Sequence, residues 1–132
     1  MAVAEPSLSR VLAVTQGAVY LGTGVWALVH RDSFERVTGP KTDFWLVRTV
    51  GALIGIVGGT LLWAGVRRRV SPELKGLAMG SAAVLGSVDV VYTAKGRIPP
   101  VYLLDAVAEA ALTGGWLMSR LSPPAGPLRR GL

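Results

Sequence analysis

Residues 49–66, TVGALIGIVGGTLLWAGV, decide the fold, because this stretch is almost wholly apolar and carries no charged side chain. A second uncharged stretch, VLAVTQGAVYLGTGVWALV, covers residues 11–29. At a rise of about 1.5 Å per residue, a helix of about 20 apolar residues spans the hydrocarbon core of a bilayer, which is about 30 Å thick. Each stretch is therefore predicted to form one membrane-spanning helix.

Two further apolar segments are interrupted by acids. Residues 74–93 contain Asp89, and residues 101–121 contain Asp105 and Glu109. With these segments the sequence predicts an all-α protein, an integral membrane four-helix bundle that forms a single domain over residues 1–121. The helices are expected at about residues 8–30, 44–66, 73–94 and 100–120. The proline-rich tail, residues 122–132, is expected to be disordered.

A signal peptide is the competing interpretation of the first apolar stretch. That stretch is longer than the apolar core of a signal peptide, and no cleavage site of the small-x-small type follows it. We therefore expect it to remain as a membrane span.

Short polar motifs mark the predicted ends of the helices. Residues 32–35, DSFE, form a capping box that predicts a short helix at the membrane surface. Asp43 can cap the second span, and Ser71 followed by Pro72 is a strong start for the third. The two prolines at residues 99–100 predict the start of the fourth.

The composition narrows the class of function. Of the 132 residues 51% are hydrophobic and 17% are charged, and Cys is absent. Without Cys, a disulfide scaffold, a Cys-ligated metal site and thiol catalysis are excluded. The net charge of +6 is compatible with nucleic acid binding, but the basic residues flank the apolar stretches instead of forming one face. We therefore expect the lipid bilayer as a partner and no nucleic acid.

Small residues recur at helical spacing within the predicted spans. Because small residues let helix backbones approach closely in lipid, these stripes are expected to be contact faces within the bundle or with another chain. The stripes are Gly51, Gly55 and Gly59 in the second span, Gly76, Gly80, Ala83 and Ser87 in the third, and Ala106, Ala110 and Gly114 in the fourth.

Charged residues inside the predicted spans are the most informative feature. A charge is costly in hydrocarbon, so Arg48, Asp89, Asp105 and Glu109 are expected to face the bundle interior and to pair. Arg48 shares a helix face with Gly51 and Gly55, and its guanidinium could bridge two of the acids. Three acids for one base leave a carboxyl in need of a proton, a cation or a ligand, and Glu109, the deepest, is the candidate for a proton.

Polar and aromatic residues extend this candidate site. Along the first span Gln16, Tyr20, Thr23, Ala27 and His30 form one stripe, which is expected to face the bundle and to end beside the charges. Tyr92 and Tyr102 lie near helix ends, where they form either an aromatic belt or a ligand lining. The predicted ligand-binding set is Arg48, Asp89, Asp105, Glu109, Tyr102, Tyr92, Tyr20 and His30.

Motifs for catalysis are missing from the sequence. It contains no P-loop, no dinucleotide fingerprint and no nucleophile elbow. A single His offers no pair of ligands for a metal or haem, although His30 alone could hold a pigment or haem. We therefore expect no catalytic and no metal-binding residues, and the sequence identifies no cofactor.

Two stretches resemble a family of small bacterial four-helix membrane proteins. They are SFERVTGPKTDFWLVRTVG at residues 33–51, with the motif VTGPKTDxWLVxTVG, and DVVYTAKGRIPPVYLLDAVAE at residues 89–109. The resemblance implies a bacterial inner membrane protein and implies no activity. In size and helix number the chain is also similar to DoxX-like membrane proteins, a likeness that does not transfer function.

Two functional hypotheses follow. The first is a non-enzymatic membrane protein, an accessory subunit or a protein that binds a partner, a second copy or a lipid-like molecule through an outward-facing ionic site. The second is a small membrane enzyme or proton-coupled carrier that uses Arg48, Asp89, Asp105 and Glu109. The positive-inside rule predicts cytoplasmic termini for either, because Lys and Arg are more numerous at the chain ends and at residues 67–75 than in the other loops.

Overall fold

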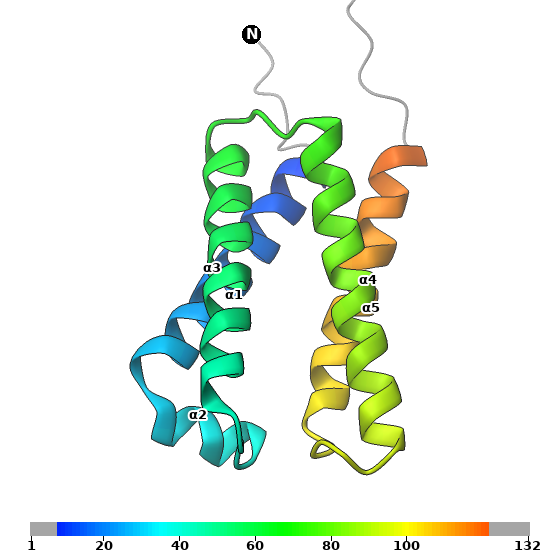
Figure 1. Ribbon diagram of the computed structural model, residues 1–132. Helices are drawn as coiled ribbons and strands as arrows, with labels where there is room; N and C mark the ends of the chain where they lie inside the picture. Colours follow the sequence, from blue (N-terminus) through cyan, green and yellow to red (C-terminus); the bar gives the residue numbers. More distant parts are fainter. Residues whose placement is uncertain (1–7, 122–132) are drawn as a thin grey trace, which may run out of the picture.

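The computed structural model describes residues 8–121, which fold into helices joined by short loops (Figure 1). The helices are α1 (Leu8–Val29), α2 (Arg31–Thr38), α3 (Phe44–Val66), α4 (Pro72–Ala94) and α5 (Tyr102–Leu121). No strand occurs in this part of the chain, so the predicted all-α class is confirmed. The disorder predicted for residues 122–132 concerns a segment outside the described residues.

Three of the described helices are long and apolar enough to cross a membrane, namely α1, α3 and α4. The fourth long helix, α5, is 20 residues long but carries Asp105, Glu109 and Arg120, and it is not among them. Charged residues lower the apolar character of a span, so composition supports three spans directly. The short helix α2 lies between α1 and α3 along the chain, where the sequence predicts a short helix.

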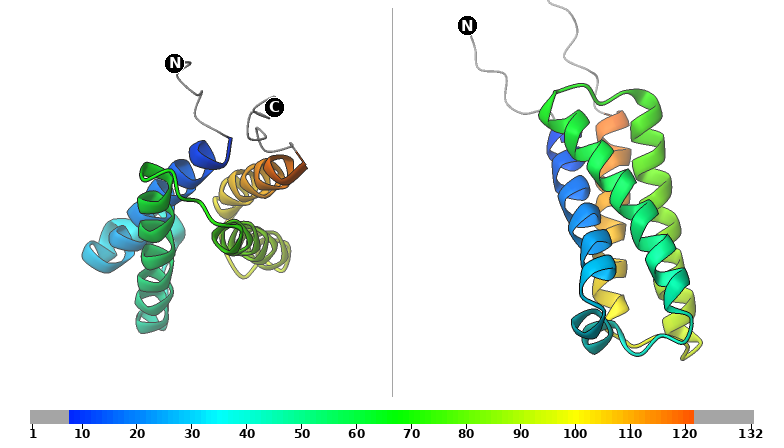
Figure 2. Two further views of the ribbon diagram at one scale, coloured as in Figure 1. Left: turned by 90° about the horizontal axis from the view of Figure 1, so that it is seen from above. Right: turned by 60° about the vertical axis from the view of Figure 1, so that its left-hand side comes forward.

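The long helices form two pairs that α1 joins. α1 crosses α3 over most of its length, and α4 packs along α5 (Figures 1 and 2). Contacts between the pairs are fewer, and most are made by α1 with α5 and α4. The start of α1, the α3–α4 turn and the end of α5 lie at one end of the molecule (Figure 1).

Glycines at seven-residue spacing hold α1 against α3. Gly24 of α1 faces Gly51 of α3 and Gly17 faces Gly58, while Gly65 of α3 packs on Ala13 and Val14 of α1. A methyl group added at Gly58 would lie 2.7 Å from both the Gly17 carbonyl oxygen and the Tyr20 Cβ. The backbones are therefore in contact, as small residues permit in membrane helix pairs.

The glycine stripe predicted for α3 is correct in part. Gly51 and Gly55 belong to the contact, because a methyl group on Gly24 would meet the backbone of both. Gly59 lies at its margin, where an added methyl group would meet only the Leu21 side chain at 3.8 Å. Along the crossing, the close contacts recur every seven residues at Gly51, Gly58 and Gly65, so the predicted spacing of four identifies only Gly51 and Gly55.

Apart from Ala106, the stripes predicted for α4 and α5 are not contact faces within the described bundle. Added methyl groups at Gly76, Gly80 and Gly114 would meet nothing within 4 Å. The buried residues are Ala78, Ala82 and Asp89 on α4 and Ala106, Glu109 and Trp116 on α5. On each helix the inward face is the one that carries a buried acid, because the cost of exposing that acid to lipid outweighs the packing of a small-residue face.

Helix ends agree with the sequence motifs to different degrees. Ser71 caps α4 by accepting a hydrogen bond from the Leu74 N–H at 3.2 Å, as predicted. Asp43 precedes α3 at the expected place but makes no side-chain capping bond. The predicted capping box does not form, because α2 is capped instead by His30, which accepts from the Ser33 N–H at 3.2 Å.

The glycine contact gives a direct test of the α1–α3 pair. We expect Gly58→Ala to destabilise the protein by about 1–3 kcal/mol, because backbone atoms cannot move aside to make room. Gly80→Ala is the matched control and should leave stability unchanged or slightly raised, since its methyl group meets open space. Thermal unfolding in detergent measures both, and equal melting temperatures for the two variants would contradict the glycine contact.

Candidate functional site

A buried amide ties α1 to both helices of the second pair. The Gln16 side chain is 0% exposed, and its Nε2 donates to the Ala78 carbonyl oxygen of α4 at 2.9 Å. Its Oε1 accepts from the indole Nε1–H of Trp116 on α5 at 2.6 Å. Trp116 therefore lies in the core and not in an interfacial aromatic belt. Both hydrogen-bonding ends of the amide are used inside the protein, as burial requires.

One turn farther along α1, Tyr20 reaches the deepest acid. The Tyr20 hydroxyl donates to Oε2 of Glu109 at 2.6 Å, and both residues are 3% exposed. The prediction that Gln16, Tyr20 and Ala27 face the bundle is therefore confirmed. A short hydrogen bond from a phenol to a carboxyl group fixes the position of both side chains.

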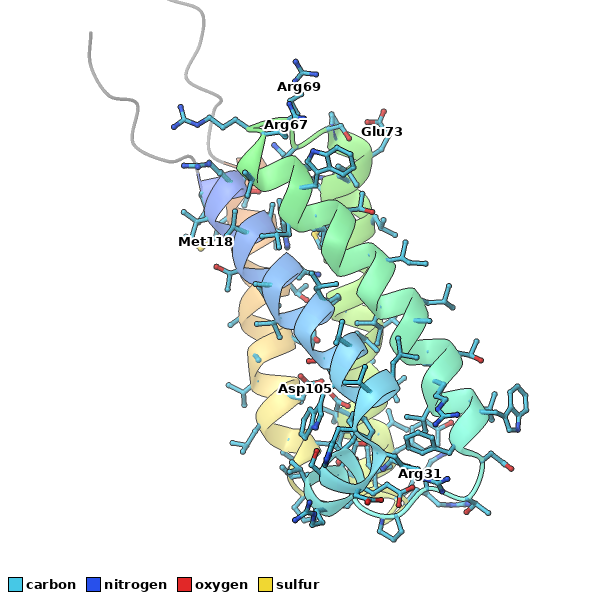
Figure 3. All side chains as sticks on the ribbon, turned by 90° about the vertical axis from the view of Figure 1, so that its left-hand side faces the viewer. Arg31, Arg67, Arg69, Glu73, Asp105 and Met118 are labelled. Carbon is cyan, nitrogen blue, oxygen red and sulfur yellow. The ribbon has the colours of Figure 1, made fainter. Side chains whose placement is uncertain are left out.

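Asp89 and Asp105 complete an acidic cluster with Glu109. Asp89 on α4 is 5% exposed, and its carboxyl group lies near that of Asp105 on α5. Glu109 is the other charged group that faces Asp89. Asp105 itself is exposed, so the prediction that it faces the bundle interior is wrong. The acidic cluster therefore connects the buried acids with the surroundings of the bundle. Figure 3 shows Asp105 toward the end of the molecule that also carries Arg31.

Two buried oxygens of this region have no hydrogen-bond partner among residues 8–121. They are Oδ2 of Asp89 and Oγ1 of Thr93, one turn apart on the same face of α4. Other helical hydroxyls, such as those of Thr60, Ser87 and Thr113, donate to the carbonyl four residues earlier. Thr93 makes no such bond, so its hydroxyl is available beside the free oxygen of Asp89.

Arg48 does not join the acidic cluster. Its side chain is exposed, and its guanidinium carbon lies 5.4 Å from the ring centre of Phe44. Among residues 8–121 the ion pair formed is Arg31 with Glu35 at 2.9 Å, on α2. The prediction that Arg48 faces the interior and bridges two acids is therefore wrong. An arginine close to a helix start can extend along an aromatic face toward the surface and needs no buried partner.

The remaining predicted residues divide between the site and the surface. Tyr20 lies in the site, whereas Tyr92, His30 and Thr23 are exposed. His30 serves as the cap of α2. Tyr102 is half-buried, and the Lys41 ammonium lies 5.1 Å from its ring centre. Of the predicted α1 stripe, Thr23 and His30 therefore do not face the bundle.

Thr93 is the site residue that the sequence reasoning misses. Its position four residues after Asp89 places it on the same helix face, and this spacing is the signal that could have identified it. Threonine is common in apolar helices, where its hydroxyl usually bonds to its own backbone, so its type alone carries no information.

The chemistry of the site is that of a set of acceptors. Carboxylates accept hydrogen bonds, and the charged groups that face Asp89 are both acids. Among the described residues, no group of three His, Cys, Asp or Glu side chains is placed to hold a metal ion. The arrangement therefore suits a ligand that brings positive charge and several hydrogen-bond donors.

Comparison of the chain with protein-family models, with curated proteins and with solved structures gives no match.

Measurements of stability test whether Arg48 is exposed while Tyr20 is part of the buried site. We expect Arg48→Ala to change the free energy of unfolding little, because the side chain is exposed and stacks on one ring. Tyr20→Phe should cost about 1 kcal/mol, because it leaves the buried Glu109 carboxyl without its donor. Thermal unfolding in detergent compares the two, with Tyr92→Phe as an exposed control. A larger loss for Arg48→Ala than for Tyr20→Phe would contradict this assignment.

Proposed function

We propose that this chain is a small, non-enzymatic integral membrane protein that binds the positively charged head group of a lipid-like ligand at the acidic cluster. The single observation that carries this proposal is Asp89, which is almost fully buried and has an unpartnered oxygen. A buried carboxylate in a membrane protein needs a proton, a cation or a donor beside it.

The chemical class of the ligand follows from the groups around Asp89. Asp105 and Glu109 add negative charge, and the Thr93 hydroxyl adds an acceptor. A primary ammonium group carries one positive charge and three N–H donors, so it could serve Asp89, Thr93 and Asp105 together. The exposed Asp105 would provide the entry from outside the bundle.

The membrane setting supports a ligand with an apolar tail. α1, α3 and α4 have the length and composition of membrane spans, and α5 would complete a four-helix membrane bundle with Glu109 turned inward. We place the protein in a bacterial inner membrane with cytoplasmic termini, on the basis of the sequence resemblance and the basic end that includes residues 67–69. An amphiphile could reach the acidic cluster while its chain stays in lipid.

A second candidate function is that of a subunit in a larger membrane assembly. Gly76 and Gly80 on α4 and Gly114 on α5 have open space where a side chain would project. Such small-residue faces allow another helix to approach closely. The hypothesis of a carrier or an enzyme has less support. It requires Arg48 as the basic residue that pairs with the acids, and Arg48 is exposed and does not join the acidic cluster.

Binding of a single-chain amine tests the proposed function. Hexadecylamine added to the protein in detergent should raise the melting temperature of the wild type, because a ligand that binds the folded state stabilises it. Hexadecanol lacks the charge and hexadecyltrimethylammonium lacks the N–H donors, so both should have much smaller effects. Asp89→Asn should remove the response to hexadecylamine, while the exposed Asp32→Asn control should retain it.

The outcomes separate the candidate functions. An equal rise with hexadecanol, or an unchanged response in Asp89→Asn, would contradict binding of an ammonium group at this site. Native mass spectrometry of the protein extracted gently from its membrane then decides the second candidate. Another chain that is retained, with no response to the amine, would favour the subunit role.

A further inference from the structure

The outer face of α3 carries a pocket at the end of the molecule opposite the acidic cluster. The pocket has a volume of about 390 Å³ and is lined by Thr60, Trp63, Ala64, Arg67 and Arg69. The first four residues follow the spacing i, i+3, i+4 and i+7, so they form one helix face. Gly58 and Gly65, which pack on α1, lie on the other face of the helix.

The lining of the pocket combines an aromatic ring with two arginines. The guanidinium carbon of Arg67 lies 5.9 Å from the ring centre of Trp63, whose side chain is 66% exposed. No acid contributes to the lining, and Figure 3 shows Arg67 and Arg69 together at this end of α3. Guanidinium groups bind phosphate through paired N–H donors.

The turn after α3 holds these arginines in a defined backbone conformation. The Arg69 N–H donates to the Ala64 carbonyl at 2.8 Å, and the Arg68 N–H donates to the Gly65 carbonyl at 3.2 Å. These two bonds define the Schellman turn that ends many helices. The turn covers carbonyl groups that would otherwise repel an anion at the end of a helix. Arg10 adds to this, because its Nε–H donates to the Gly65 carbonyl at 3.1 Å.

A turn of the same type ends α4, and it has glycine at the position that Arg68 occupies in the turn after α3. There the Arg97 N–H bonds to the Tyr92 carbonyl and the Gly96 N–H to the Thr93 carbonyl. The residue with positive φ is Gly96 in that turn, with φ of 69°, and Arg68 in the first, with φ of 57°. This conformation favours glycine. Arg68 therefore holds a backbone conformation that is less favourable for a residue with a side chain, although it does not line the pocket.

We propose that Trp63, Arg67 and Arg69 bind the phosphate group of an anionic phospholipid. Arg67 and Thr60 are seven residues apart, which is about 10 Å along a helix axis. The pocket therefore runs from the charged end of α3 toward its apolar part, as the head group and the start of an acyl chain require. This inference concerns a different site from the acidic cluster and shares with the proposed function only the membrane placement.

Native mass spectrometry in detergent measures this site with defined lipids. The wild type should bind phosphatidylglycerol more tightly than phosphatidylcholine with the same acyl chains. In the double variant R67Q/R69Q the ratio of the two affinities should fall by about tenfold or more. The reason is that each basic residue at an anionic membrane surface contributes on the order of 1 kcal/mol. Trp63→Leu tests the ring separately, because an exposed side chain can be replaced without disturbing the core.

Two matched controls distinguish a built site from general positive charge. Arg68→Gly removes one charge from the same turn without changing the pocket lining and should keep the preference. The double variant K95Q/R97Q removes the same charge as R67Q/R69Q from the turn after α4 and should also keep it. A loss of equal size in either control, or a wild type that binds both lipids equally, would overturn the proposal.

A competition experiment with inorganic phosphate distinguishes a phospholipid head group from a soluble phosphate ion as the ligand of this site. If phosphate alone binds the lipid-free protein in an Arg67-dependent manner and displaces phosphatidylglycerol at similar concentration, the ligand is a soluble anion and the lipid assignment fails. If millimolar phosphate leaves the lipid bound, the lipid assignment stands. The hexadecylamine response should persist in R67Q/R69Q, so failure at one site is distinguishable from failure at the other.

Discussion

The side-chain amide of Gln16 is the interaction on which the arrangement of the helices depends. α1 and α3 form one close pair and α4 and α5 another. The amide has a donor and an acceptor, so one side chain satisfies the Ala78 carbonyl of α4 and the indole of Trp116 on α5. Without it, a large ring in the core would carry an unpaired N–H. A single polar residue in an apolar helix therefore sets how the pairs meet.

The position of the acidic cluster follows from the same helix. Tyr20 lies one turn from Gln16 and bonds to Glu109, so α1 fixes the rotation of α5 at two points. That rotation brings Asp105 next to Asp89 of α4. The three acids gather because two helix contacts position them, and the unpartnered oxygens of Asp89 and Thr93 are the features that this packing leaves unsatisfied.

The sequence predicts those features that depend on one helix at a time. Uncharged length identifies α1 and α3 as candidate membrane spans, and the cost of charge in lipid correctly predicts that Asp89 and Glu109 are buried. Prediction from the sequence fails where the position of a side chain depends on a neighbouring helix or ring. Arg48 has a surface and an aromatic ring within reach, and spacing alone does not show that it uses them. Likewise α3 carries glycines at periods of four and of seven, and only the crossing with α1 selects Gly58 and Gly65.

The composition of α5 has a consequence for the biogenesis of the protein. This helix carries Asp105, Glu109 and Arg120, so its transfer into lipid as an isolated segment is less favourable than that of α3. Glu109 is buried against Tyr20 of α1 and Gly86 of α4, and both of these helices are synthesised earlier. The proposed fourth span would therefore enter the bilayer as the second arm of a hairpin with α4, and α1 must already be in place to receive it. Membrane insertion and tertiary assembly would then be one event for this helix.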